Sequence, residues 1–144
     1  MPKPYLLHPA VVHFPLALLL TGLVGACAAA WRKRPAWLND AVSWLLWLGT
    51  ASAWAALALG MLAKRTAPHV PPAWEALDLH ETLGYWTAGS FTALSVWRRF
   101  FSQRAPAWFL LAWLAAAAVL CATGYYGGEL VFTHNMGTAA SVEQ

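Results

Sequence analysis

Residues 9–31 read PAVVHFPLALLLTGLVGACAAAW, an apolar run of 23 residues that contains no Asp, Glu, Lys or Arg. About 20 apolar residues in a helix span the hydrocarbon core of a bilayer, so this run predicts a membrane-spanning helix. Residues 41–63 and 105–128 form two further uncharged runs of spanning length. Residues 82–97 form a shorter fourth run, which qualifies as a span if its polar lead-in, residues 75–81, is buried in protein.

The composition agrees with a membrane protein. The 144 residues are 60% hydrophobic and 10% charged, far from the usual composition of soluble domains. We therefore expect one domain over residues 1–144, an all-α antiparallel bundle of four transmembrane helices. The helices are expected at residues 7–31, 38–63, 78–98 and 106–134.

Basic residues predict the orientation of these helices. Six of the nine Lys and Arg residues lie between helices one and two or between helices three and four: Arg32, Lys33, Arg34, Arg98, Arg99 and Arg104. Loops rich in Lys and Arg stay on the cytoplasmic side of a membrane. Both termini are then expected on the outer side, and the protein is expected to be a multi-pass protein of the inner (cytoplasmic) membrane.

All the histidines fall on the outer side of this topology: His8, His13, His69, His80 and His134. Helical rise from the inner tryptophans, Trp31, Trp97 and Trp108, gives their depths. His13 and His80 come out about 27 and 26 Å from the inner belt, and His8 and His134 about 35 and 39 Å. The sequence therefore predicts two layers, His13 with His80 and His8 with His134.

Strongly polar side chains inside a membrane span are costly and usually functional. Imidazoles that face one another across a bundle suit the axial ligation of a haem iron. We expect His13 and His80 to ligate one haem b, and His8 and His134 to hold a second haem or to support the first. In the structural alternative, these histidines bond to backbone carbonyls, such as those of Tyr5 and Val11, which Pro9 and Pro15 leave free.

Glycines near these histidines could admit a flat ring. Glycine lets a planar group or another helix approach the backbone closely. We expect four of them to contribute to the haem site: Gly84, Gly124, Gly127 and Gly128. Plain helix packing explains them equally well. Lys64 and Arg65 lie on the outer side and could pair with haem propionates, or they could simply extend toward the interface from a helix end.

Three segments carry a family resemblance: HPAVVHFPLAL at residues 8–18, His80 at the start of the third helix, and GGELVFTHNMG at residues 127–137. They resemble a bacterial membrane family known as domain of unknown function 2231, over nearly the whole chain. Asn135 departs from the family pattern, in which a glycine often follows the histidine. The resemblance implies redox work at the outer membrane face beside c-type cytochromes or Rieske-type iron–sulfur proteins. Carried over by motif, it points to His8, His13, Gly127, Gly128 and His134, and more loosely to His80.

Other functions remain open at this stage. The protein could be a cofactor-free accessory or scaffold subunit of a larger respiratory or photosynthetic complex, docked through a tryptophan stripe on the second helix: Trp37, Trp44, Trp47 and Trp54. It could also be an outer-facing metal handler that uses histidines with Glu81 or Glu129. The chain has no Cys-x-x-Cys-His motif, phosphate loop or nucleophile elbow, which argues against covalent c-type haem and against nucleotide or esterase chemistry. We expect an electron carrier or complex subunit rather than a stand-alone enzyme, and no nucleic-acid partner.

Overall fold

The computed structural model describes residues 4–30, 35, 37–66, 71–101 and 106–136, and the chain in these ranges is helical with short turns. The described elements are η1 (Pro4–Leu6), α1 (Leu7–Val11), α2 (His13–Ala29), α3 (Trp37–Thr66), η2 (Pro71–Ala73), α4 (Trp74–Phe100) and α5 (Ala107–Phe132). Several residues used in the sequence argument lie outside the described residues: Trp31, Arg32, Lys33, Arg34, His69 and Arg104.

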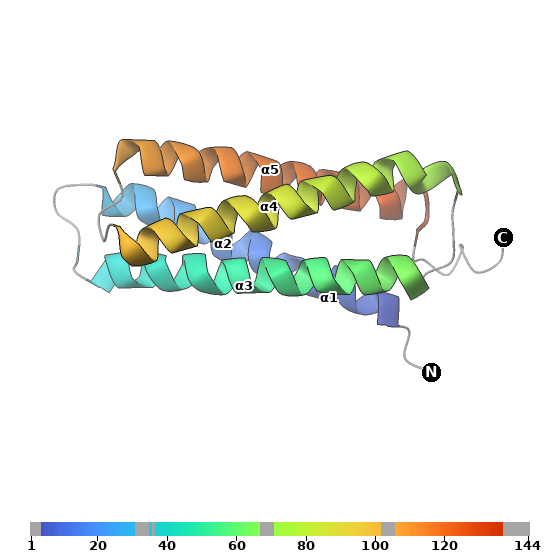
Figure 1. Cartoon of the computed structure of the whole chain (residues 1–144), viewed down its shortest axis with the longest axis horizontal. Coiled ribbons are helices and arrows are strands. Elements are labelled where there is room, and N and C mark those ends of the chain that lie inside the picture. The colour runs from blue at the N-terminus through green and yellow to red at the C-terminus, as the bar shows by residue number, and fades with distance from the viewer. Residues whose placement is uncertain (1–3, 31–34, 36, 67–70, 102–105, 137–144) are drawn as a thin grey trace.

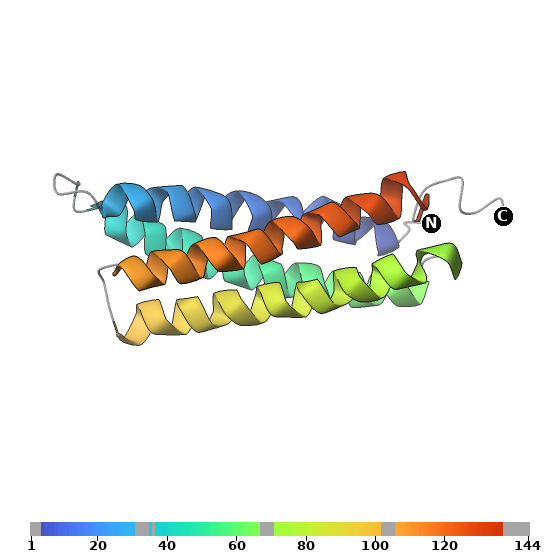
Figure 2. The same ribbon diagram turned by 90° about the horizontal axis from the view of Figure 1, so that it is seen from above.

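Four long helices run side by side along the molecule as an antiparallel bundle (Figures 1 and 2). Each packs against its neighbour in the chain, and α2 against α5 closes the ring. The segment Leu7–Ala29, α3 and α5 are each long and apolar enough to cross a membrane. The α4 helix has comparable length but carries charges at both ends, so its role as a fourth span stays a prediction. The start of α1, the end of α3, the start of α4 and the end of α5 all lie at the same end of the bundle (Figure 1).

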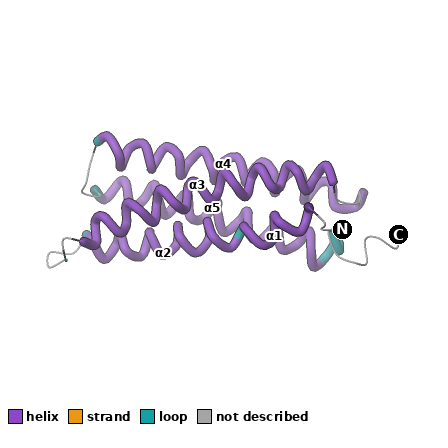
Figure 3. The backbone as a smooth tube through the Cα atoms, turned by 90° about the horizontal axis from the view of Figure 1, so that it is seen from below, coloured by secondary structure: helices purple, strands orange, loops and turns teal. Residues whose placement is uncertain are grey.

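The expected helix at 7–31 was wrong in one respect, because it is divided into α1 and α2 at Val12 (Figure 3). Pro15 has no amide hydrogen and its ring crowds the carbonyl of Val11, so the regular hydrogen-bond ladder cannot pass through this turn. The amide of Val12 still donates to the carbonyl of His8 at 3.1 Å, and the chain continues in the same direction. The other helices differ from expectation by a few residues at their ends.

The core fills the bundle toward the end opposite the histidines. Its largest fully buried apolar side chains are Leu19, Leu46, Phe91, Phe109 and Trp113. Glycines allow the closest helix contacts. A Cβ atom on Gly49 would lie 2.6 Å from Cγ of Leu19, and one on Gly22 would lie 2.9 Å from the Trp113 ring.

The tryptophan stripe of α3 faces outward. Trp37, Trp44 and Trp54 are exposed, and the half-buried Trp47 packs edge-on against Trp44 with ring centroids 5.5 Å apart. Trp54 also donates from Nε1 to the hydroxyl oxygen of Thr92 on α4 at 2.9 Å, so its ring edge contacts the bundle while the exposed parts of the stripe face outward.

Candidate functional site: a cavity with paired histidines

A cavity of about 690 Å³ opens at the end of the bundle where α1 begins and α5 ends. Its wall is mostly apolar and is built by α1, α2, α3, α4 and α5 together. The histidines that line it are His8, His13 and His80. The other predicted residues that line it are Gly84, Gly124, Gly127, Gly128 and Lys64. Most of the residues predicted from the sequence to form the site therefore line one cavity.

His8 on α1 is held against α3. Its Nδ1–H donates to the carbonyl oxygen of Ala56 at 2.9 Å. Its ring lies over Gly60, where a Cβ atom would be only 3.1 Å from Cε1 of the imidazole. Because a carbonyl can only accept, this bond fixes the proton on Nδ1 and leaves the Nε2 lone pair available in the neutral ring.

His80 on α4 is held against α5 in the same way. Its Nδ1–H donates to the carbonyl oxygen of Thr123 at 2.9 Å, and its Cε1 would be 3.0 Å from a Cβ atom on Gly127. The Thr123 hydroxyl donates to the carbonyl of Val119, so it accepts its second hydrogen bond from the hydroxyl of Thr87 at 2.9 Å. This hydroxyl pair ties α4 to α5 beside the histidine.

The two imidazoles are neighbours. The ring centroids of His8 and His80 are 6.0 Å apart and the ring planes are 80° apart. Within the described part of the chain, no protein group bonds to either Nε2. The ring beside His80 is therefore that of His8 rather than that of His13, and the expected grouping of His13 with His80, which rested on depth along the axis, stays a prediction. His13 lines the same cavity but is exposed.

His134 is separate from this pair. The α5 helix ends at Phe132, so His134 does not continue the glycine stripe, and it is not part of the cavity wall. The expected layer of His8 with His134 stays a prediction about depth, and His134 does not share the cavity wall with His8. Asn135 follows with φ of 54°, the left-handed conformation that glycine prefers and that asparagine tolerates best among other residues. Asparagine at this position is thus compatible with the backbone turn.

The predicted glycines differ in what they contact. Only Gly127 meets a histidine ring, whereas Gly84, Gly124 and Gly128 have Leu57, Leu16 and Phe132 as their nearest neighbours. Gly60, the counterpart of Gly127 on α3, was not predicted from the sequence. A signal for it was present, because Ala56 and Gly60 form a small-xxx-small pair of the kind that lets another element approach a helix closely.

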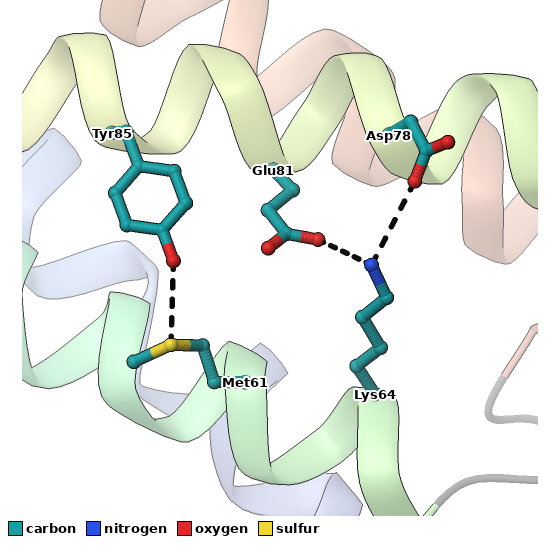
Figure 4. Close-up of polar contacts among 5 residues, drawn as sticks. All are labelled: Met61, Lys64, Asp78, Glu81 and Tyr85. Atoms are coloured by element: carbon teal, nitrogen blue, oxygen red, sulfur yellow. Dashed lines mark hydrogen bonds and ion pairs between the residues drawn. The ribbon is translucent and has the colours of Figure 1, made fainter.

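Lys64 sits at the rim of the cavity and bridges α3 to α4 (Figure 4). Its ammonium donates to the Glu81 carboxylate and lies 3.7 Å from the Asp78 carboxylate. One turn deeper, the Tyr85 hydroxyl donates to the Met61 sulfur at 3.4 Å. Arg65 is exposed and outside the cavity wall, so the geometry brings only Lys64 of the two predicted cations to the site.

These observations define the class of protein: an integral, all-helical membrane protein with a histidine-lined cavity at one end of its bundle. The chain belongs to the family described as a predicted membrane protein (DUF2231), which matches residues 4–140. The family resemblance drawn from the sequence motifs is therefore confirmed. No curated protein and no solved structure matches the chain.

Proposed function

We propose that this protein is a membrane-bound b-type haem protein for electron transfer, with His8 and His80 as the axial ligands of one haem. The observation that carries the proposal is that the two imidazole rings lie 6.0 Å apart in one cavity. Each ring also has its Nδ1–H bonded to a backbone carbonyl, a bond that the structural alternative expects as well. Metal-ligating histidines commonly use the second ring nitrogen in this way, because the bond fixes the tautomer and the ring orientation.

The donor set fits a porphyrin. Among the described residues, no three His, Cys, Asp or Glu side chains converge. Zinc and copper sites built by protein alone use three or more such ligands. A haem needs only two protein ligands, because the porphyrin supplies the other four nitrogens. This favours the haem proposal over the metal handler for the described part of the chain.

The dimensions fit as well. Metal–imidazole bonds of about 2.0–2.1 Å on opposite sides of one ion would place two ring centres roughly 6 Å apart. The observed separation is 6.0 Å. The cavity of about 690 Å³ falls within the range of cofactor pockets, and its apolar wall would exclude water from the bound group.

With His8 and His80 holding it, a haem would supply one-electron redox chemistry. Of the expected one or two haems we propose one, because His8 and His80 form the imidazole pair found among the described residues. Lys64 would have to share its ammonium between Glu81 and a haem propionate. We place the cavity at the outer face of a bacterial inner membrane, because Arg98 and Arg99, in the last turn of α4, lie at the opposite end of the bundle. A c-type cytochrome, a Rieske-type protein or a quinol at that face would exchange the electron.

The experiment is a comparison of four single variants purified in detergent. Oxidised and dithionite-reduced spectra with a pyridine haemochrome assay measure haem per chain. We expect His8→Ala and His80→Ala to lose haem, and the matched controls His13→Ala and His134→Ala to keep it. A featureless spectrum from well-folded protein grown with ample haem would overturn the proposal, as would full haem occupancy in both His8→Ala and His80→Ala.

The exposed tryptophan face of α3 supports a second candidate, an accessory subunit of a larger redox complex. Trp44 and Trp54 are 59% and 47% exposed, and large aromatic side chains are typical of interface centres. Exposed tryptophans are also common where a membrane helix faces lipid near the interface. Replacing Trp44 and Trp54 by Leu should release the partner complex while haem occupancy stays unchanged. Retention of every partner by that variant would exclude this face.

A further inference from the structure

The two histidines are held by matching structural units. In each unit the imidazole lies on a helical glycine, and its Nδ1–H bonds to the carbonyl of the residue four positions before that glycine. The first unit is His8 with Ala56 and Gly60, and the second is His80 with Thr123 and Gly127. A helical carbonyl has a second lone pair free, so the imidazole can bond without breaking the helix.

The packing around these units repeats too. Buried residues follow each histidine at offsets of 7, 11, 14 and 18: Pro15, Leu19, Gly22 and Ala26 after His8, and Thr87, Phe91, Leu94 and Arg98 after His80. Buried residues precede each glycine at offsets of 18, 14, 11, 10 and 7: Val42, Leu46, Gly49, Thr50 and Ala53 before Gly60, and Phe109, Trp113, Ala116, Ala117 and Leu120 before Gly127. The bundle is thus two similar helical hairpins that present one histidine each.

We propose that Gly60 and Gly127 are positioning residues, which act with the carbonyls of Ala56 and Thr123 to lock both imidazoles as neutral Nδ1–H tautomers with nearly perpendicular planes. The tautomer part concerns the haem-free protein. The part that concerns iron rests on the proposed function, because perpendicular ligand planes matter only when both Nε2 atoms share one metal.

Space makes the glycines necessary. A Cβ atom would stand 3.2 Å from Nδ1 of His8 at position 60 and 3.4 Å from Nδ1 of His80 at position 127. Each ring would have to move by a few tenths of an ångström away from its helix. The carbonyl that anchors Nδ1 belongs to that same helix, so the ring cannot move away and keep a hydrogen bond of 2.9 Å.

The 80° angle between the rings has an electronic consequence. Each imidazole donates π density perpendicular to its own plane. Perpendicular rings act on two different iron d orbitals and keep their energies close, whereas parallel rings act on one orbital and split the pair. Near-degenerate orbitals give a strongly anisotropic low-spin resonance signal at low field, and split orbitals give a three-line rhombic signal.

The first test uses the haem-free protein labelled with ¹⁵N-histidine. We expect the nitrogen shifts of His8 and His80 at neutral pH to show a protonated Nδ1 and an unprotonated Nε2, with assignment by His8→Ala and His80→Ala. Gly60→Ala should change only the His8 tautomer signal, and Gly127→Ala only that of His80. The control is Gly89→Ala on α4, where a Cβ atom would meet nothing within 4 Å. A mixture of tautomers in the wild-type protein would overturn the proposal, whatever the variants do.

The second test is electron paramagnetic resonance of the oxidised haem-loaded protein. We expect the strongly anisotropic low-field signal in the wild type and in Gly89→Ala. Gly60→Ala and Gly127→Ala should lose it and should bind haem about 10–100-fold more weakly, the usual cost of losing an outer partner of a metal ligand. Bound haem with a rhombic wild-type signal would refute the perpendicular positioning alone. Absence of haem would refute the proposed function and leave the tautomer test in force.

Discussion

Among the described glycines, Gly49 is the one at which an added Cβ atom would lie closest to a side chain of another helix. Replacing Gly49 by alanine therefore tests the packing of the bundle. The new Cβ would lie 2.6 Å from both Cγ and Cδ2 of Leu19, and 3.3 Å from Cβ of Leu18. Leu19 has no exposed surface, and its Cγ is not the free end of a flexible chain, so α2 must move away from α3. Packing is the main force between helices in lipid, so this movement should be costly.

The magnitude follows from two opposing effects. Overpacking a filled core costs about 1–3 kcal/mol. Alanine gains up to about 1 kcal/mol over glycine inside a helix. We therefore expect Gly49→Ala to lower the free energy of unfolding by up to about 2 kcal/mol. The control Gly89→Ala gains the helix propensity without a clash, and it should leave the free energy of unfolding unchanged or raise it.

A double-mutant cycle with Leu19→Ala sharpens the test. Leu19→Ala alone should cost about 2–5 kcal/mol because it leaves a cavity. In the double variant the methyl group at position 49 occupies part of that cavity, so the combined cost should be smaller than the sum by about 1–3 kcal/mol. Reversible unfolding in mixed micelles, followed by circular dichroism, measures all four proteins. If the cost of the double variant equals the sum of the two single costs to within about 0.5 kcal/mol, the contact between position 49 and Leu19 is refuted.

Three further predictions concern the free energy of unfolding in the same assay. Asn135→Gly should leave the free energy of unfolding unchanged, whereas Asn135→Ala should lower it by about 1–2 kcal/mol, because alanine is strained at a φ of 54°. Equal stability of the two variants would contradict the left-handed conformation at this position. Arg98 is 2% exposed and donates from Nε to Ser43 Oγ at 3.0 Å, so Arg98→Ala should cost about 2–5 kcal/mol and Arg98→Met less, because methionine keeps the buried methylenes. Lys64→Met should change the stability by less than about 1 kcal/mol, because the ion pair with Glu81 is partly exposed to solvent. A larger loss would show that the rim is shielded from water.

The sequence predicted that the histidines of the cavity gather at one end of the bundle. It did not predict which side chains contact one another there. Depth along a helix axis depends only on residue count and rise, so placing the histidines at one end needed no tertiary information. The partner of His80 depends on which way each side chain points around its helix. A residue count along the axis does not record that direction.

Gly60 illustrates the same limit. Gly127 was singled out because it stands in a visible glycine cluster, but Gly60 stands alone near the end of its helix. Its importance comes from the imidazole that lies over it, which belongs to a residue 52 positions earlier in the chain. The repeat of buried positions between the two hairpins is equally hidden, because the residues at matching positions differ: Pro15 corresponds to Thr87, and Ala26 to Arg98.

By itself, the sequence determined the class of the protein and its helical elements. Long uncharged runs can satisfy their backbone only as helices in an apolar medium, so hydropathy alone predicts an all-helical membrane chain. Only the tertiary structure decided that His8 meets His80, that their rings stand 80° apart, and that Lys64 is already paired across the cavity rim. These features depend on how the hairpins are rotated about their axes when they pack, and close packing of many distant side chains sets that rotation together.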